Sequence, residues 1–461
     1  MFGVVRHIHF VGIGGVGMSG LAAILLQQGF VITGSDLAES AAVERLRAQG
    51  AKIFIGHRPE HIGSADVVVY SSAVDPETNP EVVAARKQKI PVIRRAEMLA
   101  EVSRLRYTIA VAGTHGKTTT TSMTGLVLLQ AGLDPTIIVG GRLSNFGNTN
   151  ARLGKGEWIV VEADEYDRSF LQLSPVIAVI TTVEEEHVDI YPTRQELLQA
   201  FEEFANKVPF YGAVVACLDD PGVRELLPVI HRKIRTYGTV RQSDVRAEKI
   251  QQRGFRSYFE VFAEEEMLGT VELAVPGIHN VRNALAAIAV GLELQIPFEV
   301  IREGLTRYTG VARRLEHKGT FHDIPVFDDY AHHPTELKVT LETLRQIFPH
   351  RRIVCVFQPH TYTRTQRFYR EFARALLDAD VAILTAVYPA REQPIPGVDS
   401  RLICEEAQKL GHRSVECGEN FDHIIALLER MLTPNDVVIT VGAGSVWQIA
   451  ERLTQLAAAE K

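Results

Sequence analysis

The chain has few cysteines and lacks long apolar stretches. Its 461 residues include only four cysteines, Cys217, Cys355, Cys404 and Cys417, which are widely spaced and form no Cys-x-x-Cys pair. This distribution predicts free thiols in a reducing compartment and argues against a disulfide framework or a cysteine-based zinc site. No apolar run approaches the roughly 18 residues of a membrane span, and no cationic segment with an apolar signal core opens the chain. We therefore predict a cytoplasmic protein that makes no contact with a membrane.

Excess positive charge is also absent. The formal net charge is −7, and no basic run stands out. Such a chain has no electrostatic attraction to nucleic acid or to anionic lipid, so both are excluded as expected partners. Hydrophobic residues make up 46% of the chain and charged residues 23%, which is typical of a globular protein long enough for about three domains.

Short apolar runs alternate with helical stretches along the whole length, and no repeat or low-complexity tract interrupts them. This rhythm is typical of α/β domains with parallel sheets. We predict three of them: a Rossmann-like domain over residues 1–105, a central P-loop-like ATPase domain over 106–312, and a Rossmann-like α/β domain over 313–461.

A glycine-rich turn joins an apolar strand at 107–112 to the start of a helix, and its residues are Gly113, Thr114, His115, Gly116, Lys117, Thr118 and Thr119. Backbone N–H groups of such a turn can point at phosphate oxygens, the Lys117 ammonium can reach the terminal phosphates, and the Thr118 hydroxyl can join Mg²⁺. Val111 stands where the usual loop has its first glycine, so the loop is shorter than usual. The turn predicts an ATP site, and the alternative is a structural turn with a surface lysine.

A second glycine cluster follows the first strand. Residues 12–17 read Gly-Ile-Gly-Gly-Val-Gly between a strand at 8–11 and a helix, and Asp36 ends the next strand. The chain has, in order, a strand, a glycine cluster, a helix, a second strand and an acidic residue. This order favours a dinucleotide or nucleotide-sugar site over a structural turn. The residues alone leave NAD, the default ligand, and a UDP-sugar as alternatives.

Acidic and imidazole groups follow two strands of the middle segment. Glu162 ends an apolar strand 44 residues after Thr118, and His187 follows a strand at 176–181. Glu162 would face the phosphates there and complete a Mg²⁺ shell of hard oxygen ligands. The alternatives are surface charge for Glu162 and a histidine without a metal for His187.

Two further clusters lie toward the C-terminus. Asn280 and Asn283 are three apart at a helix start, so their amides share a face on which they could bind adenine or ribose, or form a helix cap. Residues 328–334 read Asp-Asp-Tyr-Ala-His-His-Pro after a strand, which is too many titratable groups for a plain turn. Together with the donors at 313–314 and 358–364, these parts suggest ATP-driven ligation of a carboxylic acid.

The ordered motifs resemble those of the Mur ligases. They are Gly-Thr-His-Gly-Lys-Thr at 113–118, Glu-Ala-Asp-Glu at 162–165, Gly-Ile-His-Asn at 277–280, Gly-Val-Ala-Arg-Arg at 310–314 and Asp-Tyr-Ala-His-His-Pro at 329–334. The resemblance covers nearly the whole chain. It implies three domains and an ATP-dependent ligase of peptidoglycan synthesis.

The resemblance also implies roles for particular residues. It assigns the first domain to the UDP part of a UDP-sugar, in place of NAD, through Gly14, Gly15, Gly17, Asp36, His57 and Ser71. It assigns ATP to the residues of the phosphate loop, 113–119, and to Asn280, Asn283, Arg314 and Asp329. It assigns Mg²⁺ to Thr118, Glu162 and His187, and the incoming amino acid to Tyr330, His332 and Arg364.

Within this family, the glycine-rich start and the doubled histidine at 332–333 resemble the ligase that joins L-alanine to UDP-N-acetylmuramate. Lys117 and Glu162 would act in phosphoryl transfer, and His187 or His332 could accept the proton of the amine. Thr361 departs from the arginine that relatives commonly carry there. The alternatives are a recycling ligase that adds a preformed tripeptide, a nicotinamide dehydrogenase and a nucleotide-binding regulator. A monomer and a homodimer are both compatible with the sequence.

Overall fold

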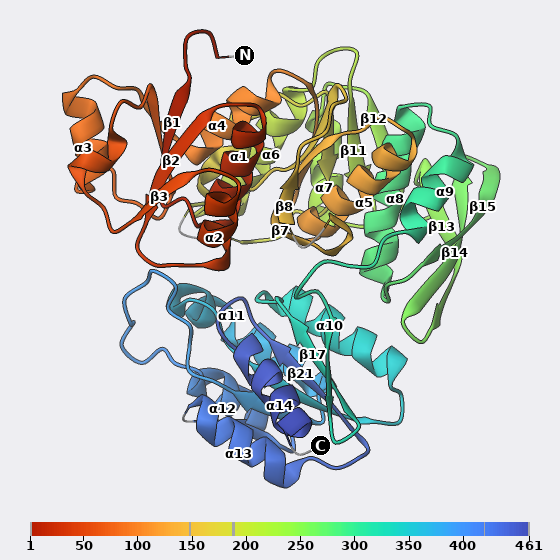
Figure 1. The fold of residues 1–461 in the computed structure, drawn as a ribbon. Helices are drawn as coiled ribbons and strands as arrows, with labels where there is room; N and C mark the ends of the chain where they lie inside the picture. The colour runs from red at the N-terminus through yellow and green to blue at the C-terminus, as the bar shows by residue number, and fades with distance from the viewer. Residues whose placement is uncertain (1, 147–148, 187–189, 419, 460–461) are drawn as a thin grey trace. The chain divides into compact units, whose positions relative to one another are not determined.

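A computed structural model describes residues 2–146, 149–186, 190–418 and 420–459 (Figure 1). The chain divides into two compact units. One comprises residues 1–250, 258–274 and 280–309, and the other comprises 251–257, 275–279 and 310–461.

The first sheet is parallel and has the strand order β3-β2-β1-β4-β5. Its elements are β1 (His7–Val11), α1 (Val16–Gln27), β2 (Val31–Asp36), α2 (Ala41–Ala48), β3 (Lys52–Ile55), η1 (Pro59–Ile62), β4 (Val67–Tyr70), α3 (Pro80–Lys87), β5 (Val92–Arg94) and α4 (Arg95–Ser103). Side chains of β4 alternate between two cores, because Val67 and Val69 pack with α1 and α2 whereas Val68 and Tyr70 pack with α3. Helical cover on both faces explains the continuous apolar runs of these strands.

The second sheet has ten strands in the order β15-β14-β13-β12-β11-β10-β6-β9-β7-β8. Its strands are β6 (Tyr107–Ala112), β7 (Thr136–Leu143), β8 (Thr149–Arg152), β9 (Trp158–Glu162), β10 (Ile177–Ile180), β11 (Ala213–Cys217), β12 (Ile234–Gly238), β13 (Val245–Arg253), β14 (Arg256–Ala263) and β15 (Glu266–Leu273). Its helices are α5 (Lys117–Gln130), η2 (Ser144–Phe146), η3 (Tyr166–Gln172), α6 (Arg194–Asn206), α7 (Pro221–Leu226), η4 (Leu227–Val229), α8 (Ile278–Glu293) and α9 (Phe298–Thr306). Strand β6 lies between β10 and β9 and is parallel to both, so the turns that follow these three strands share one edge of the sheet.

The first sheet and most of the second sheet belong to one unit, and α1 joins them. This helix packs against β7 and β8. The Asn150 amide on β8 donates to Val16 O and, at 3.4 Å, to Ser19 Oγ. A polar side chain therefore links the glycine-rich end of the first domain to the middle domain.

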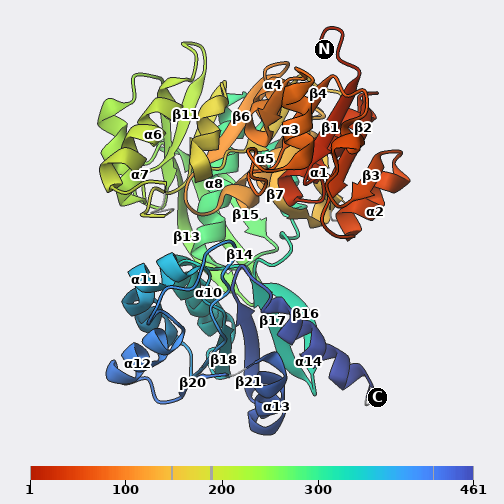
Figure 2. The same ribbon diagram turned by 90° about the vertical axis from the view of Figure 1, so that its left-hand side faces the viewer.

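The third sheet has the order β16-β17-β21-β18-β19-β20 and is parallel except for the β16–β17 pair. Its elements are β16 (Glu316–Phe321), β17 (Ile324–Asp329), α10 (Pro334–Ile347), β18 (Arg352–Phe357), α11 (Tyr362–Ala375), η5 (Leu376–Asp378), β19 (Val381–Leu384), α12 (Arg401–Lys409), β20 (Val415–Cys417), α13 (Phe421–Met431), β21 (Asp436–Val441) and α14 (Trp447–Ala459) (Figure 2). Ile353 and Phe357 of β18 face one core, and Val354 and Val356 face the other. The domain is therefore also a sheet with helices on both faces.

The predicted fold class, three α/β domains with parallel sheets, is confirmed, whereas the boundaries after residues 105 and 312 remain predictions.

The expectation of four free thiols is wrong for one pair. Cys404 on α12 and Cys417 at the end of β20 form a disulfide with a Cα–Cα distance of 6.7 Å. Cys217 and Cys355 are free and buried. The spacing rule missed the pair because the α12–β20 connection brings together cysteines that are 13 residues apart. Among the described residues, no helix has the length and apolar character needed to span a bilayer.

Candidate active site

The glycine cluster at residues 12–17 lies where the strand order of the first sheet reverses, between β1 and β4. Gly12 follows β1 with φ +79°, a conformation that disfavours a side chain, and a Cβ there would lie 3.2 Å from the Cβ of Ser71. The Gly14 N–H donates to Asp36 Oδ2 at 2.7 Å. The acid at the end of β2 therefore holds the glycine turn directly, at the place where open α/β sheets bind nucleotides.

The other residues assigned to the UDP-sugar lie around this turn. Gly15 is exposed, and a Cβ on Gly17 would lie 3.1 Å from the Arg95 side chain. His57, just after β3, has Nδ1 2.9 Å from Ser35 Oγ, which lies beside Asp36. The six assigned residues thus lie at or just after the carboxyl ends of four parallel strands, β1 to β4, at one edge of the sheet.

The phosphate loop connects β6 to α5 and is shaped by two glycines with positive φ, Gly113 (+133°) and Gly116 (+81°). Thr182, after β10, fixes the loop. Its Oγ1 accepts from the His115 N–H at 2.9 Å and lies 2.9 Å from Thr114 Oγ1. The Thr181 hydroxyl donates to His115 O at 2.5 Å. The residues that follow the neighbouring strand β10 therefore hold the loop in place.

Lys117 is the first residue of α5, and its side chain folds back into the loop. The ammonium donates to Gly113 O at 2.7 Å and to Thr114 O at 3.3 Å. It also contacts both carboxylate oxygens of Glu165, at 3.0 and 2.8 Å. Burial alone would lower the pKa of Lys117, but the carboxylates of Glu165, Asp164 and Glu162 outweigh that effect and hold its pKa above the ordinary value. The lysine is therefore cationic at neutral pH.

Glu162 lies at the end of β9 and faces the next residue of α5. Its Oε2 accepts from Thr118 Oγ1 at 2.8 Å and from the Gly140 N–H at 2.7 Å. A carboxylate and a hydroxyl in contact beside a phosphate loop are hard oxygen donors, which fits Mg²⁺. His187, the third residue assigned to the metal, lies outside the described residues.

The two asparagines share a face of α8, as expected, and lie beside the phosphate loop. Asn283 Nδ2 donates to Asn280 Oδ1 at 3.4 Å, and Asn283 Oδ1 accepts from Thr120 Oγ1 at 3.2 Å. A Cβ on Gly116 would lie 2.5 Å from Asn283 Oδ1, which explains why glycine stands there. Thr119 is buried in the first turn of α5.

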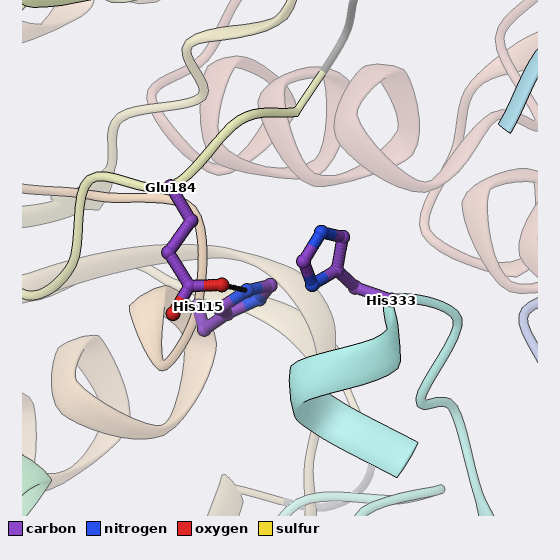
Figure 3. A group of neighbouring side chains, drawn as sticks. All are labelled: His115, Glu184 and His333. Carbon is purple, nitrogen blue, oxygen red and sulfur yellow. Dashed lines mark ion pairs between the residues drawn. The ribbon is translucent and has the colours of Figure 1, made fainter. Parts of the chain in front are cut away.

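His115 of the phosphate loop forms an ion pair with Glu184, with 3.4 Å between His115 Nε2 and Glu184 Oε2 (Figure 3). The Glu184 N–H donates to Thr114 Oγ1 at 3.1 Å. The segment that leads to His187 is thus attached to the phosphate loop by its backbone and by a side chain.

The second unit carries a polar cluster at the carboxyl end of β17. Asp329 is buried, and its carboxylate accepts from the Leu315 and Ala331 N–H groups at 2.8 Å each. Burial raises the pKa of Asp329 to about 6, although Arg314 and the two N–H groups act in the opposite direction. Arg314 Nη1 in turn lies 3.4 Å from Glu336 Oε1 and stacks over the Tyr330 ring.

The two adjacent histidines, His332 and His333, have different surroundings. His333 is the N-cap of α10 and is drawn at the start of that helix in Figure 3. The His332 ring lies 5.5 Å from the Tyr330 ring and 5.8 Å from the His360 ring, centroid to centroid. Arg364 Nη1 is 3.0 Å from His360 Nδ1. The predicted residues Tyr330, His332 and Arg364 therefore belong to one cluster, which His360 completes.

Five residues that contact the phosphate loop or Glu162 were not identified from the sequence: Gly140, Glu165, Thr181, Thr182 and Glu184. The two threonines had a usable signal, because a polar pair directly follows an apolar strand next to the phosphate-loop strand. Glu165 lies in the Glu-Ala-Asp-Glu motif at 162–165, but the spacing of the motif does not tell which carboxylate faces Lys117.

Family models match most of the chain. A model described as "Mur ligase family, catalytic domain" matches residues 7–107, "Mur ligase middle domain" matches 111–291, and "Mur ligase, glutamate ligase domain" matches 313–444. Among curated proteins, the UDP-N-acetylmuramate--L-alanine ligase of Salinibacter ruber is 52% identical over 98% of this chain and 95% of its own length. The ligase of the same name from Geobacter sp. strain M21 is 50% identical over 98% of both chains.

Solved structures agree with these matches. The crystal structure of the UDP-N-acetylmuramate-alanine ligase of Thermotoga maritima has a TM-score of 0.84 at 30% identity, covering 99% of this chain and all of that one. A murein peptide ligase from Psychrobacter arcticus has a TM-score of 0.72 at 25% identity, covering 98% of both chains. With three domain models in order and relatives that match over its full length, the chain belongs to the Mur ligase family.

Proposed function

We propose that this protein is an ATP-dependent ligase that joins L-alanine to the lactyl carboxylate of UDP-N-acetylmuramate, giving UDP-N-acetylmuramoyl-L-alanine, ADP and phosphate. The observation that carries the proposal is the Lys117–Thr118–Glu162 arrangement at one sheet edge. Its relatives with about 50% identity over nearly the full chain are named for this reaction. The substrates are therefore small molecules, and the reaction belongs to peptidoglycan synthesis.

The first chemical step follows from the substrate. A carboxylate is a poor electrophile, so its oxygen attacks the γ-phosphorus of ATP, which forms an acyl phosphate and releases ADP. The Lys117 ammonium offsets negative charge as the phosphoryl group transfers. Thr118 and Glu162 would hold Mg²⁺, which supplies further charge neutralisation when bound. Asn280, Asn283, Arg314 and Asp329 would contact the nucleotide.

The second step forms the amide. The neutral amine of L-alanine attacks the acyl carbon, phosphate leaves, and one proton is lost from nitrogen. Tyr330, His332 and Arg364 would bind the amino acid, and His332 or His187 would accept the proton. Gly14, Gly15, Gly17, Asp36, His57 and Ser71 would hold the UDP part of the other substrate. We further propose a cytoplasmic enzyme, because ATP and a UDP-sugar are its substrates, with effects on cell shape and division through the cell wall.

The test is ADP release from the purified protein with ATP, Mg²⁺ and UDP-N-acetylmuramate, with each substrate omitted in turn. We expect release that requires both UDP-N-acetylmuramate and L-alanine. ADP release that is the same without L-alanine, or none in the complete mixture, would contradict the proposal.

A further inference from the structure

Two carboxylates follow β9, and the structure gives them different partners. Glu162 binds the Thr118 hydroxyl and the Gly140 N–H. Glu165, three residues later, binds the Lys117 ammonium with both oxygens. One acid thus faces the side of the loop suited to a metal, and the other faces the lysine that would contact phosphate.

Glu165 is enclosed by protein. Its side chain has no exposed surface, and the Lys117 side chain is 13% exposed. Its backbone is fixed as well, because Glu165 O accepts from Tyr191 Oη at 2.8 Å and from the Arg168 N–H at 3.0 Å. The carboxylate is therefore presented to the ammonium from a rigid point rather than from a flexible surface side chain.

This contact fixes where the ammonium lies. A lysine side chain has four rotatable carbon–carbon bonds and three donor hydrogens. Here the Lys117 donors are directed to Gly113 O, Thr114 O and Glu165, and the first two acceptors belong to the phosphate loop itself. Gly113 O and Thr114 O are neutral acceptors, so Glu165 is the charged partner among these three contacts. The Glu165 carboxylate adds a charged contact to the same ammonium, with both of its oxygens.

We propose that Glu165 is a positioning residue for phosphoryl transfer: it acts through Lys117 and holds the ammonium where the phosphoryl group transfers. The inference rests on the proposed ligase function. It assigns no contact between Glu165 and substrate. Because the Glu165 carboxylate also repels phosphate, its benefit must appear in the transition state rather than in nucleotide affinity.

The test is a double-mutant cycle on kcat with E165Q, K117A and the double variant, all assayed by ADP release with L-alanine. E165Q keeps the size of the side chain and removes its charge. We expect E165Q to lower kcat roughly 10- to 100-fold, as misplacement of a catalytic group does, with a KM for ATP within about threefold of the wild type. In the K117A background, E165Q should change kcat less than about threefold, because its effect passes through the lysine.

Two variants separate positioning from folding. E165D retains the charge on a shorter arm and should recover at least half of the loss on a logarithmic scale. E293Q removes a carboxylate that pairs with Lys233 and Arg235 elsewhere in the same unit, and it should leave kcat unchanged. The inference would be overturned if E165Q lowered kcat by as large a factor in the K117A background as in the wild type. It would also be overturned if the lower activity of E165Q matched a lower fraction of folded protein. If the wild type shows no alanine-dependent ADP release, the proposed function itself fails, which is a different result.

Discussion

At the residue scale, the Lys117 ammonium is held by two carbonyls of its own loop and by the buried Glu165 carboxylate, and the Thr118 hydroxyl is held by Glu162. Lys117, Thr118 and Glu162 were predicted from a glycine turn and a strand end, because local patterns encode such positions. Glu165 was not predicted as the lysine's partner, because the pairing depends on how the chain turns after β9. The Cys404–Cys417 disulfide was missed for a similar reason, since it depends on the connection between α12 and β20.

The Lys117 ammonium donates to two carbonyls of the phosphate loop, Gly113 O and Thr114 O. Replacing Lys117 with alanine removes this positive charge from the loop. We expect K117A to lower kcat roughly 100- to 1,000-fold, because a preorganised charge that stabilises the transition state is lost. The measurement is steady-state ADP release. Thermal unfolding of K117A checks the fold, because the variant leaves the Glu165 carboxylate buried without its ammonium. Turnover near the wild-type value in a folded variant would refute the role of Lys117.

Asp329 makes stability depend on pH. Its pKa is raised to about 6 in the folded protein from an ordinary value of 3.8, so the folded state binds this proton more tightly than the unfolded state. Protonation of Asp329 therefore increases the free energy of unfolding as pH falls below about 6, and this stabilisation is lost as pH rises through 6. From pH 7 to pH 5 we expect about 1 kcal/mol more stabilisation in the wild type than in D329N. Denaturant unfolding at both pH values measures the difference, and equal pH dependence in both proteins would contradict it.

At the element scale, loops at the carboxyl ends of parallel strands could be predicted, because each follows an apolar run. Strand β17 and the loops after β1, β6 and β9 lie where the sequence placed them. The β13–β15 strands and the antiparallel β16 could not be predicted in the same way, because their mixed polar sequences lack a continuous apolar run. A buried network that joins several elements of the first sheet was also beyond sequence patterns.

That network centres on Glu81 of α3, which is fully buried. Its carboxylate accepts from Ser35 Oγ at 2.5 Å and from the Arg58 N–H at 3.2 Å. It also lies 2.9 Å from His61 Nδ1 and 3.4 Å from His9 Nε2. Burial would raise the pKa of Glu81, but the hydrogen bonds from His9, Ser35 and His61 outweigh it and lower the pKa to about 2.

We expect E81A to reduce the free energy of unfolding by about 3–5 kcal/mol, because it leaves buried polar partners without their anion. The carboxylate's contribution is fully present above about pH 4.5 and is lost as pH falls toward 2, since the folded pKa is the lower one. Urea unfolding at pH 7 measures the effect. E60A on the exposed face of η1 is the matched control and should change stability by less than about 0.5 kcal/mol. An E81A protein as stable as E60A would show that the network does not stabilise the domain.

At the scale of the whole molecule, three successive α/β domains could be predicted from the alternation of apolar runs and helices. The residues assigned to ATP are divided between the two compact units, with Lys117 and Asn283 in one and Arg314 and Asp329 in the other. Local sequence patterns do not encode how separate units would be brought to a common ligand.

The proposed ATP contacts lie in both units, so the proposal predicts that ligands draw the two units together. We expect the radius of gyration, measured by small-angle X-ray scattering, to decrease when a non-hydrolysable ATP analogue, Mg²⁺ and UDP-N-acetylmuramate are added together. R314A, which removes an assigned contact from one unit, should reduce that change. A radius of gyration that is the same with and without ligands would contradict closure on binding.

The amine specificity tests the central claim most directly. Purified protein with ATP, Mg²⁺ and UDP-N-acetylmuramate is given L-alanine or L-alanyl-γ-D-glutamyl-diaminopimelate, and both ADP and the mass of the UDP-linked product are measured. The account predicts ADP release with L-alanine and a product heavier by one alanyl residue. Release only with the tripeptide would make this protein a recycling ligase, and no release with either amine would contradict ligase activity.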